Sequence, residues 1–142
     1  MYCIVDDLLK KIPQAVLVKL TDDAGTGAID QTKVDDAMID AANEIDSYCR
    51  SRYPVPFNPV PGIIKKLALD IALYNLFSRR GFEEGSPDKI IADRYKAAIE
   101  LLEKIARGLV SLGDSGNAPP PPQGVDISNP PRRFSRPKLE GF

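Results

Sequence analysis

The chain has 142 residues, of which 43% are hydrophobic and 27% are charged, and its formal net charge is -1. These values are typical of one globular domain, or of a smaller domain with an appendage, and they provide no overall charge that would attract nucleic acid. Histidine is absent, which excludes a Ser-His triad and the ordinary general base near neutral pH, so we expect neither an enzyme nor a cofactor.

Other common signatures are also missing from the sequence. It has no P-loop, no G-x-S-x-G and no G-x-G-x-x-G motif. Cys3 and Cys49 are too few for a disulfide scaffold, and we expect Cys49 to be a small core residue in a protein made in a reducing cytoplasm. No apolar run approaches the ~20 residues of a membrane span, and the N-terminus lacks the layout of a signal peptide.

Two short helical segments are predicted at the start of the chain, over residues 6–12 and 13–20. Pro13 suits the first position of the second segment, where the missing N–H is not needed. The run AVLVKL at residues 15–20 also fits a strand, and its pattern leaves that alternative open.

The stretch LTDDAGTGAID, residues 20–30, has the acids and glycines of a calcium-binding loop. With Asp22 at the first of the twelve loop positions, Ala24 and Thr26 replace acidic ligands, and Lys33 stands where a bidentate glutamate is required. A cation in that place leaves little affinity for Ca²⁺. We therefore expect a turn without a metal, followed by a helix that Asp30 caps.

A longer helix is predicted after Asp30. Its apolar residues recur at intervals of 4, 3, 4 and 3, which draws one stripe along a helix: Val34, Met38, Ala41, Ile45 and Tyr48. Pro54 and Pro56 end this helix, and the following residues form a stiff, extended connection.

The next predicted helix, residues 62–80, is apolar on nearly every side. Such a helix is buried at the centre of a domain or clamped between subunits. In the second case Leu69, Leu73 and Leu76 are candidate contacts with a partner. Asp70 interrupts the apolar surface, and we expect it to pair with Lys66 one turn earlier.

A last helix is predicted to start at Ser86-Pro87-Asp88, which supplies a cap, a first-turn proline and an acid. Apolar residues again recur at intervals of 4, 3, 4 and 3 from Ile91 to Ile105, and Gly108 is the expected end. The fold class expected is all-α, a small domain of four to five helices over residues 1–112.

The composition changes at Gly113. Residues 113–142 contain seven prolines and four glycines, and such a segment buries too little apolar surface to fold alone. We expect an extension that partner subunits hold in place, with a solvated basic end as the alternative. Its cations and aromatic residues are types that interface centres favour, and the candidate partner contacts are Arg132, Arg133, Phe134, Arg136 and Phe142.

Several short motifs occur in order along residues 1–112. They are GTGxID at residues 25–30, EIDSY at 44–48, RYPVP at 52–56, DIAxY at 70–74, RYxxAxxLL at 94–102 and IAxG at 105–108. In this order and spacing they resemble the small connector protein of Mu-like phages and prophages, a family once catalogued as a domain of unknown function. The tail after Gly113 departs from the pattern that carries this resemblance.

The resemblance implies a structural protein of the virion neck, assembled in the cytoplasm of a bacterial host. Such connectors resemble adaptor rings of twelve subunits beneath the portal, around a channel through which DNA passes without sequence-specific binding. The implied partners are further copies of the chain, the portal protein and the next neck or tail-completion protein. A small helical nucleic-acid-binding or regulatory module is the alternative, based on basic residues 132–138, and a calcium-responsive or enzymatic protein is the third hypothesis.

Overall fold

The computed structural model of the chain describes residues 1–81 and 88–113, and within these ranges all regular structure is α-helical. The helices are α1 (Val5–Leu9), α2 (Gln14–Thr21), α3 (Gln31–Cys49), α4 (Gly62–Ser78) and α5 (Asp88–Ala106). The predicted all-α class is therefore confirmed, and the run at residues 15–20 lies in a helix. None of the described helices has the length and apolar character needed to cross a membrane.

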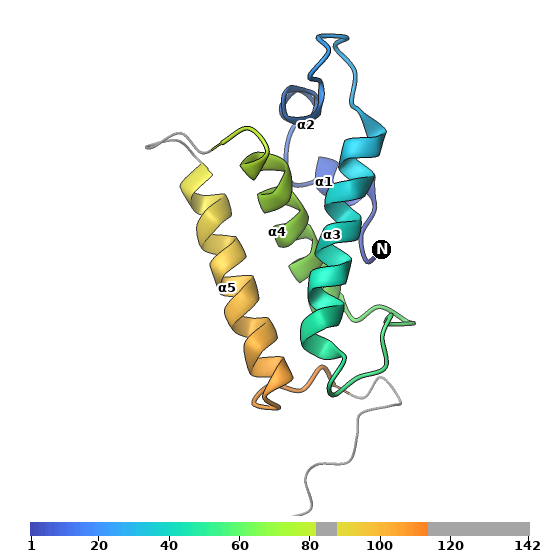
Figure 1. The fold of residues 1–142 in the computed structure, drawn as a ribbon, viewed down its shortest axis with the longest axis vertical. Coiled ribbons are helices and arrows are strands. Elements are labelled where there is room, and N and C mark those ends of the chain that lie inside the picture. Colours follow the sequence, from blue (N-terminus) through green and yellow to red (C-terminus); the bar gives the residue numbers. More distant parts are fainter. Residues whose placement is uncertain (82–87, 114–142) are drawn as a thin grey trace, which may run out of the picture.

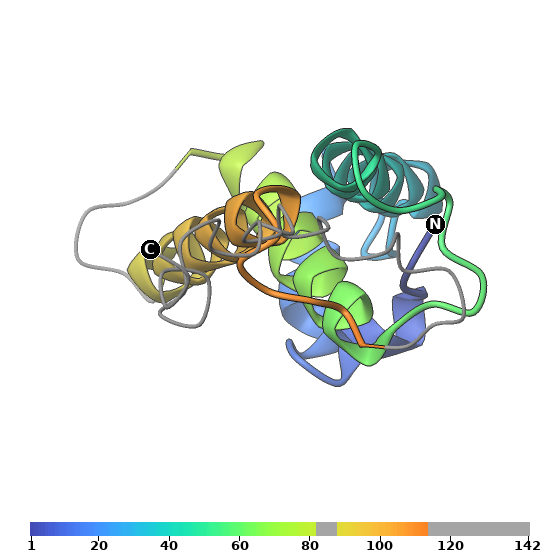
Figure 2. The same cartoon turned by 90° about the horizontal axis from the view of Figure 1, so that it is seen from below.

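Helix α4 lies at the centre of the described chain. Figures 1 and 2 show α3 and α5 on either side of it and the short helices α1 and α2 against a further side. Helix α4 contacts each of these four helices. This arrangement accounts for a helix that is apolar all round, because almost every side of it is covered by the same chain.

The core forms where the apolar stripes of α3 and α5 meet α4. The predicted stripe positions that are buried are Val34, Met38, Ala41, Ile45, Ala98, Leu102 and Ile105, while Tyr48, Ile91 and Tyr95 lie partly buried at the edge. Burial of each large aliphatic side chain contributes about 1.5–3 kcal/mol relative to exposure. The recurring spacing thus identifies the face of α3 and of α5 that packs in the core.

Helix α3 begins where the sequence predicts. The carboxylate of Asp30 accepts hydrogen bonds from the backbone N–H groups of Thr32, at 3.1 Å, and Lys33, at 3.4 Å. Two otherwise unpaired amides at the helix start are satisfied in this way.

The N-terminal residues are fixed against α3 by Tyr2. Its hydroxyl donates a hydrogen bond to the carboxylate of Asp46 and accepts one from the backbone N–H of Phe57, at 3.1 Å. The Tyr2 and Phe57 rings are 5.8 Å apart between centroids. Burial and the bond to Asp46 raise the pKa of Tyr2, so the phenol stays neutral and the contact persists across the ordinary pH range.

Helix α5 ends at Ala106, and the predicted C-terminal glycine follows two residues later. Gly108 has a φ of +77°, and the N–H of Leu109 donates to the carbonyl of Lys104 at 2.9 Å. The guanidinium group of Arg52 occupies the space that a side chain at Gly108 would need. Glycine at this position therefore serves both the left-handed turn and the approach of Arg52 to the negative end of α5.

Candidate functional site

The acidic loop between α2 and α3 forms an internal turn. The carboxylate of Asp22 accepts hydrogen bonds from the backbone N–H groups of Thr26, at 2.9 Å, and Gly27, at 2.6 Å. These bonds stabilise the charged form and lower the pKa of Asp22. Both of its oxygens are therefore engaged by the loop's own backbone.

Two cations of the chain lie at the open side of this loop. The Lys33 ammonium lies 2.7 Å from the carboxylate of Asp23 and 3.0 Å from the carbonyl of Thr21. Arg79, just after α4, donates to the same Asp23 carboxylate and to the carbonyl of Leu20, each at 2.9 Å. These bonds lower the pKa of Asp23 and attach the loop to the end of α4. Lys33, the residue that breaks the calcium pattern, is thus part of the loop's own structure.

Leu69, Leu73 and Leu76 do not form a surface for a partner. Their exposed fractions are 7%, 1% and 0%, and all three belong to the core cluster. The sequence-based assignment of these leucines to an interface is therefore wrong. The physical reason is that the neighbouring helices of the same chain already cover α4.

The other predicted contact residues lie outside the described residues: Arg132, Arg133, Phe134, Arg136 and Phe142. The same is true of Ser86 and Pro87, the predicted start of the last helix. Asp88 is the first described residue of α5.

Asp70 is buried on α4, and the predicted ion pair with Lys66 is absent among the described residues, so that prediction is wrong. Burial raises the pKa of Asp70, while the positive charges of Arg94, Lys66 and Lys11 act in the opposite direction. The raised pKa means that folding disfavours the charged carboxylate.

Replacing Asp70 by Asn should therefore increase the free energy of unfolding at pH 7. The folded-state pKa lies above the unfolded one, so the protonated carboxyl favours folding at low pH and this contribution is lost as the pH rises through the folded-state pKa. The gain should vanish below about pH 3.9, the pKa of an unperturbed Asp, where both states are protonated. Urea unfolding of both proteins from pH 3 to 7 measures this.

The exposed Asp93 on α5 provides a matched control, since Asp93→Asn should change the stability little. An Asp70→Asn variant that is less stable than the parent at pH 7 would mean that attraction to Arg94 and Lys66 outweighs burial.

Both cysteines are buried thiols. Cys3 and Cys49 have exposed fractions of 3% and 0%, and burial raises the pKa of each to about 11. The prediction that Cys49 is a core residue is confirmed. Neither thiol is a nucleophile near neutral pH, because the thiolate is the reactive form.

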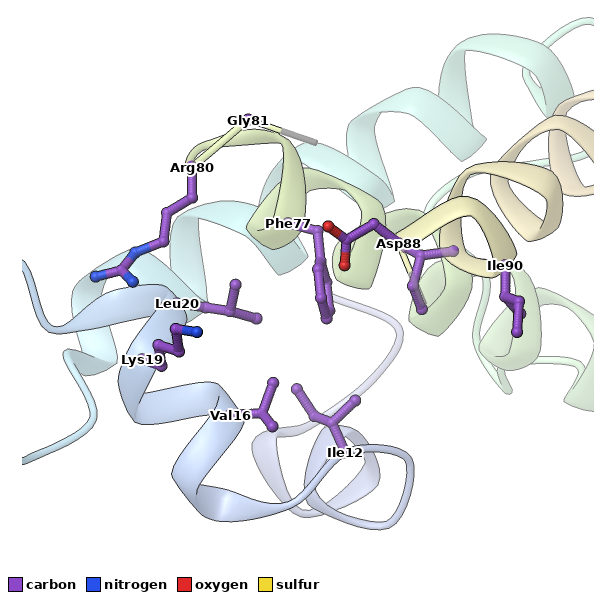
Figure 3. Close-up of a pocket in the computed structure, with 10 residues that line it drawn as sticks. Ile12, Val16, Lys19, Leu20, Phe77, Arg80, Gly81, Asp88 and Ile90 are labelled. Atoms are coloured by element: carbon purple, nitrogen blue, oxygen red, sulfur yellow. The ribbon is translucent and has the colours of Figure 1, made fainter. Parts of the chain in front are cut away.

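An apolar pocket of about 830 Å³ lies where α2, the end of α4 and the start of α5 come together. Figure 3 shows its apolar lining, with Ile12, Val16 and Leu20 facing Phe77 across the opening. Its charged lining residues are Lys19, Arg80 and Asp88. Gly81 and Asp88, on either side of residues 82–87, both belong to the lining. A pocket of this size and character has room for apolar side chains.

The pocket was not predicted from the sequence. Its lining comes from residues 12–20 and, far from these in the chain, from the two segments 77–81 and 88–91. Their convergence depends on how α2 and α5 pack on α4. The sequence indicated the pocket only through apolar residues that lie outside the main stripes. One of them is Ile90, which is 57% exposed.

Comparison with known proteins connects this fold to phage proteins. The family model described as Bacteriophage Mu, Gp36 matches residues 2–128, which extends beyond the motifs at residues 1–112. The Mu-like prophage FluMu protein gp36 of Haemophilus influenzae is 32% identical over 113 residues, covering 80% of this chain and 76% of the relative. Gene product J of Escherichia phage Mu is 29% identical over 146 residues, covering 99% and 98%. The chain therefore belongs to the Bacteriophage Mu Gp36 family.

Proposed function

We propose that the chain is a structural subunit of the phage head–tail connector. In this role it forms a ring, of twelve copies, between the portal and the next neck or tail-completion protein, around the channel for genomic DNA. The observation that carries the proposal is the family match over residues 2–128, because the motifs within it are those that resemble neck connectors. The site of action is the virion neck, after assembly in the bacterial cytoplasm.

The chemistry of the chain supports an assembly role over catalysis. Histidine is absent from the sequence, the two cysteines are buried as neutral thiols, and the acids of the α2–α3 loop are engaged by backbone amides, Lys33 and Arg79. We assign no catalytic, metal-binding or cofactor-binding residue. Under this proposal, the protein acts through surfaces that contact other subunits.

A ring also places a geometric demand on each subunit. Cyclic assemblies use heterologous interfaces, in which two different patches of each subunit meet. The buried leucines of α4 cannot supply one. The described features with suitable chemistry are the apolar pocket and the exposed residues of α3. The sequence adds the basic residues 132–138.

Loss of the gene tests the proposal. A phage or induced prophage that lacks it should produce DNA-filled heads and separate tails that do not join, because the ring between them is missing. Expression of the intact chain from a plasmid should restore joined particles and serves as the control. Intact, infectious virions without this protein would contradict the proposal.

A nucleic-acid-binding module is the alternative, favoured by the four cations and no acid of residues 132–138. It predicts DNA binding that weakens steeply with salt. The formal net charge of -1 disfavours it, since DNA-binding domains usually carry a marked positive charge.

A further inference from the structure

The outward side of α3 is a helix face without a partner among the described residues. Figures 1 and 2 show α4 against one side of α3 and no described helix over its outer side. Helices α2 and α5 also contact α3. Exposed residues on this face are Asp36, Ile39, Asp40 and Asn43. Ile39 is 43% exposed and offers apolar surface near the middle of this face.

The acids beside Ile39 differ from the other acids of α3. Asp46 accepts from Tyr2, Glu44 accepts from Tyr95, and Asp35 accepts from Gln31. Asp36 and Asp40 have neither an ion pair nor a hydrogen bond to any described residue. The positive end of a helix stabilises acids within its first turn, and Asp36 and Asp40 lie beyond the first turn of α3. Both carboxylates are therefore available to pair with cations from another segment.

One segment of the same chain has the complementary pattern. Residues 132–138, RRFSRPK, carry four cations and no acid, and Phe134 stands between arginines. The α3 face offers an apolar side chain between carboxylates, and the segment offers an aromatic side chain between guanidinium groups. Such pairs are favoured at interfaces, since Arg forms bidentate bonds with carboxylates and aromatic residues supply the apolar contact.

The length of the intervening chain permits contact with another copy. The 18 residues from 114 to 131 can span at most ~60 Å, whereas α3, with 19 residues, is about 28 Å long. The segment can therefore reach past its own helical body. Two complementary patches on one chain, an acidic helix face and a basic segment, meet the requirement of a heterologous ring interface.

We propose that residues 132–138 of one copy dock on the outward face of α3 of a second copy, with Arg side chains at Asp36 and Asp40 and Phe134 against Ile39. This inference rests on the proposed connector role and specifies one interface of the ring. The contact is electrostatic at an exposed surface, so it weakens as salt is added.

A charge exchange between two variants tests the contact. The face variant is Asp36→Lys/Asp40→Lys, and the tail variant is Arg133→Glu/Arg136→Glu, both in the full chain. At low salt the parent should self-associate with rising concentration in sedimentation velocity, and each variant alone should stay monomeric, because like charges then meet. An equimolar mixture of the two should regain association, since every contact between unlike copies again joins opposite charges.

The control variant Asp93→Lys/Glu100→Lys changes the same number of exposed acids on α5 and should associate like the parent. Circular dichroism should show that all variants are folded, since the changed residues of α3 and α5 are exposed.

A parent that stays monomeric at every concentration, or a mixture that stays monomeric, would overturn the inference. Both results are expected if the segment docks on its own α3 and not on that of a second copy. Neither result bears on whether the protein lies in the virion neck, so failure of this contact and failure of the connector role are distinguishable.

Discussion

The Leu76→Ala variant should lose about 2–5 kcal/mol of the free energy of unfolding as an isolated chain, the range for truncating a fully buried leucine. Leu76 has an exposed fraction of 0% and belongs to the central cluster around α4. Its removal leaves a cavity in the monomer, so the loss does not depend on protein concentration or on a partner. Urea unfolding of the isolated chain at two concentrations measures it.

The matched control is Leu109→Ala. Leu109 is 72% exposed, and the same truncation there should change the free energy of unfolding by less than about 0.5 kcal/mol. If Leu76→Ala left the stability of the isolated chain unchanged and weakened only its assembly, α4 would be an interface helix, as one alternative from the sequence proposed. The burial of α4 by its own chain would then be wrong.

The second large effect is expected at the end of α5. Gly108→Ala should cost about 1.3–3 kcal/mol of stability. Of this, ~1–2 kcal/mol comes from placing an L side chain at a left-handed φ, here +77°. About 0.3–1 kcal/mol more comes from displacing the Arg52 guanidinium, a cation at the negative end of a helix.

A double-mutant cycle separates these two contributions. In an Arg52→Ala background, Gly108→Ala should cost only the backbone strain. Gly27→Ala provides the matched value, because Gly27 has a φ of +74° and an added side chain there meets no atom within 4 Å. Equal costs for Gly108→Ala with and without Arg52 would show that the guanidinium does not pack on this turn.

Features encoded within a single helix were predictable from the sequence. The cap of α3 at Asp30, the buried stripe of α3 and the glycine turn at Gly108 after α5 all follow from spacings of a few residues, and the structure confirms each. The position of Lys33 in the loop pattern argued against a calcium site, but its bonds to Thr21 and Asp23 could not be foreseen.

Features that depend on the packing of distant segments were not predictable. An all-round apolar helix has the same pattern whether its own chain or a neighbour covers it, so Leu73 was ambiguous until α3 and α5 were placed. The i,i+4 spacing of Lys66 and Asp70 permits an ion pair without requiring one, and Lys66 is instead exposed to water. Tyr2 and Asp46 are 44 residues apart, and no local signal joins them.

The burial of α4 limits which of the described residues could contact a partner under the proposed role. The described features that remain available are the pocket at α2, α4 and α5 and the exposed acidic face of α3. The basic residues 132–138 are a further candidate that is known from the sequence alone.

Reconstruction of the intact particle by electron cryomicroscopy tests the connector role most directly. We predict a ring of this chain, with twelve copies, between the portal and the next neck or tail protein, and with helices in the order and packing of α1 to α5. Labelling of the chain with a bulky C-terminal tag should add density at the same level. A neck fully accounted for by other proteins, with this chain absent from the virion, would contradict the account.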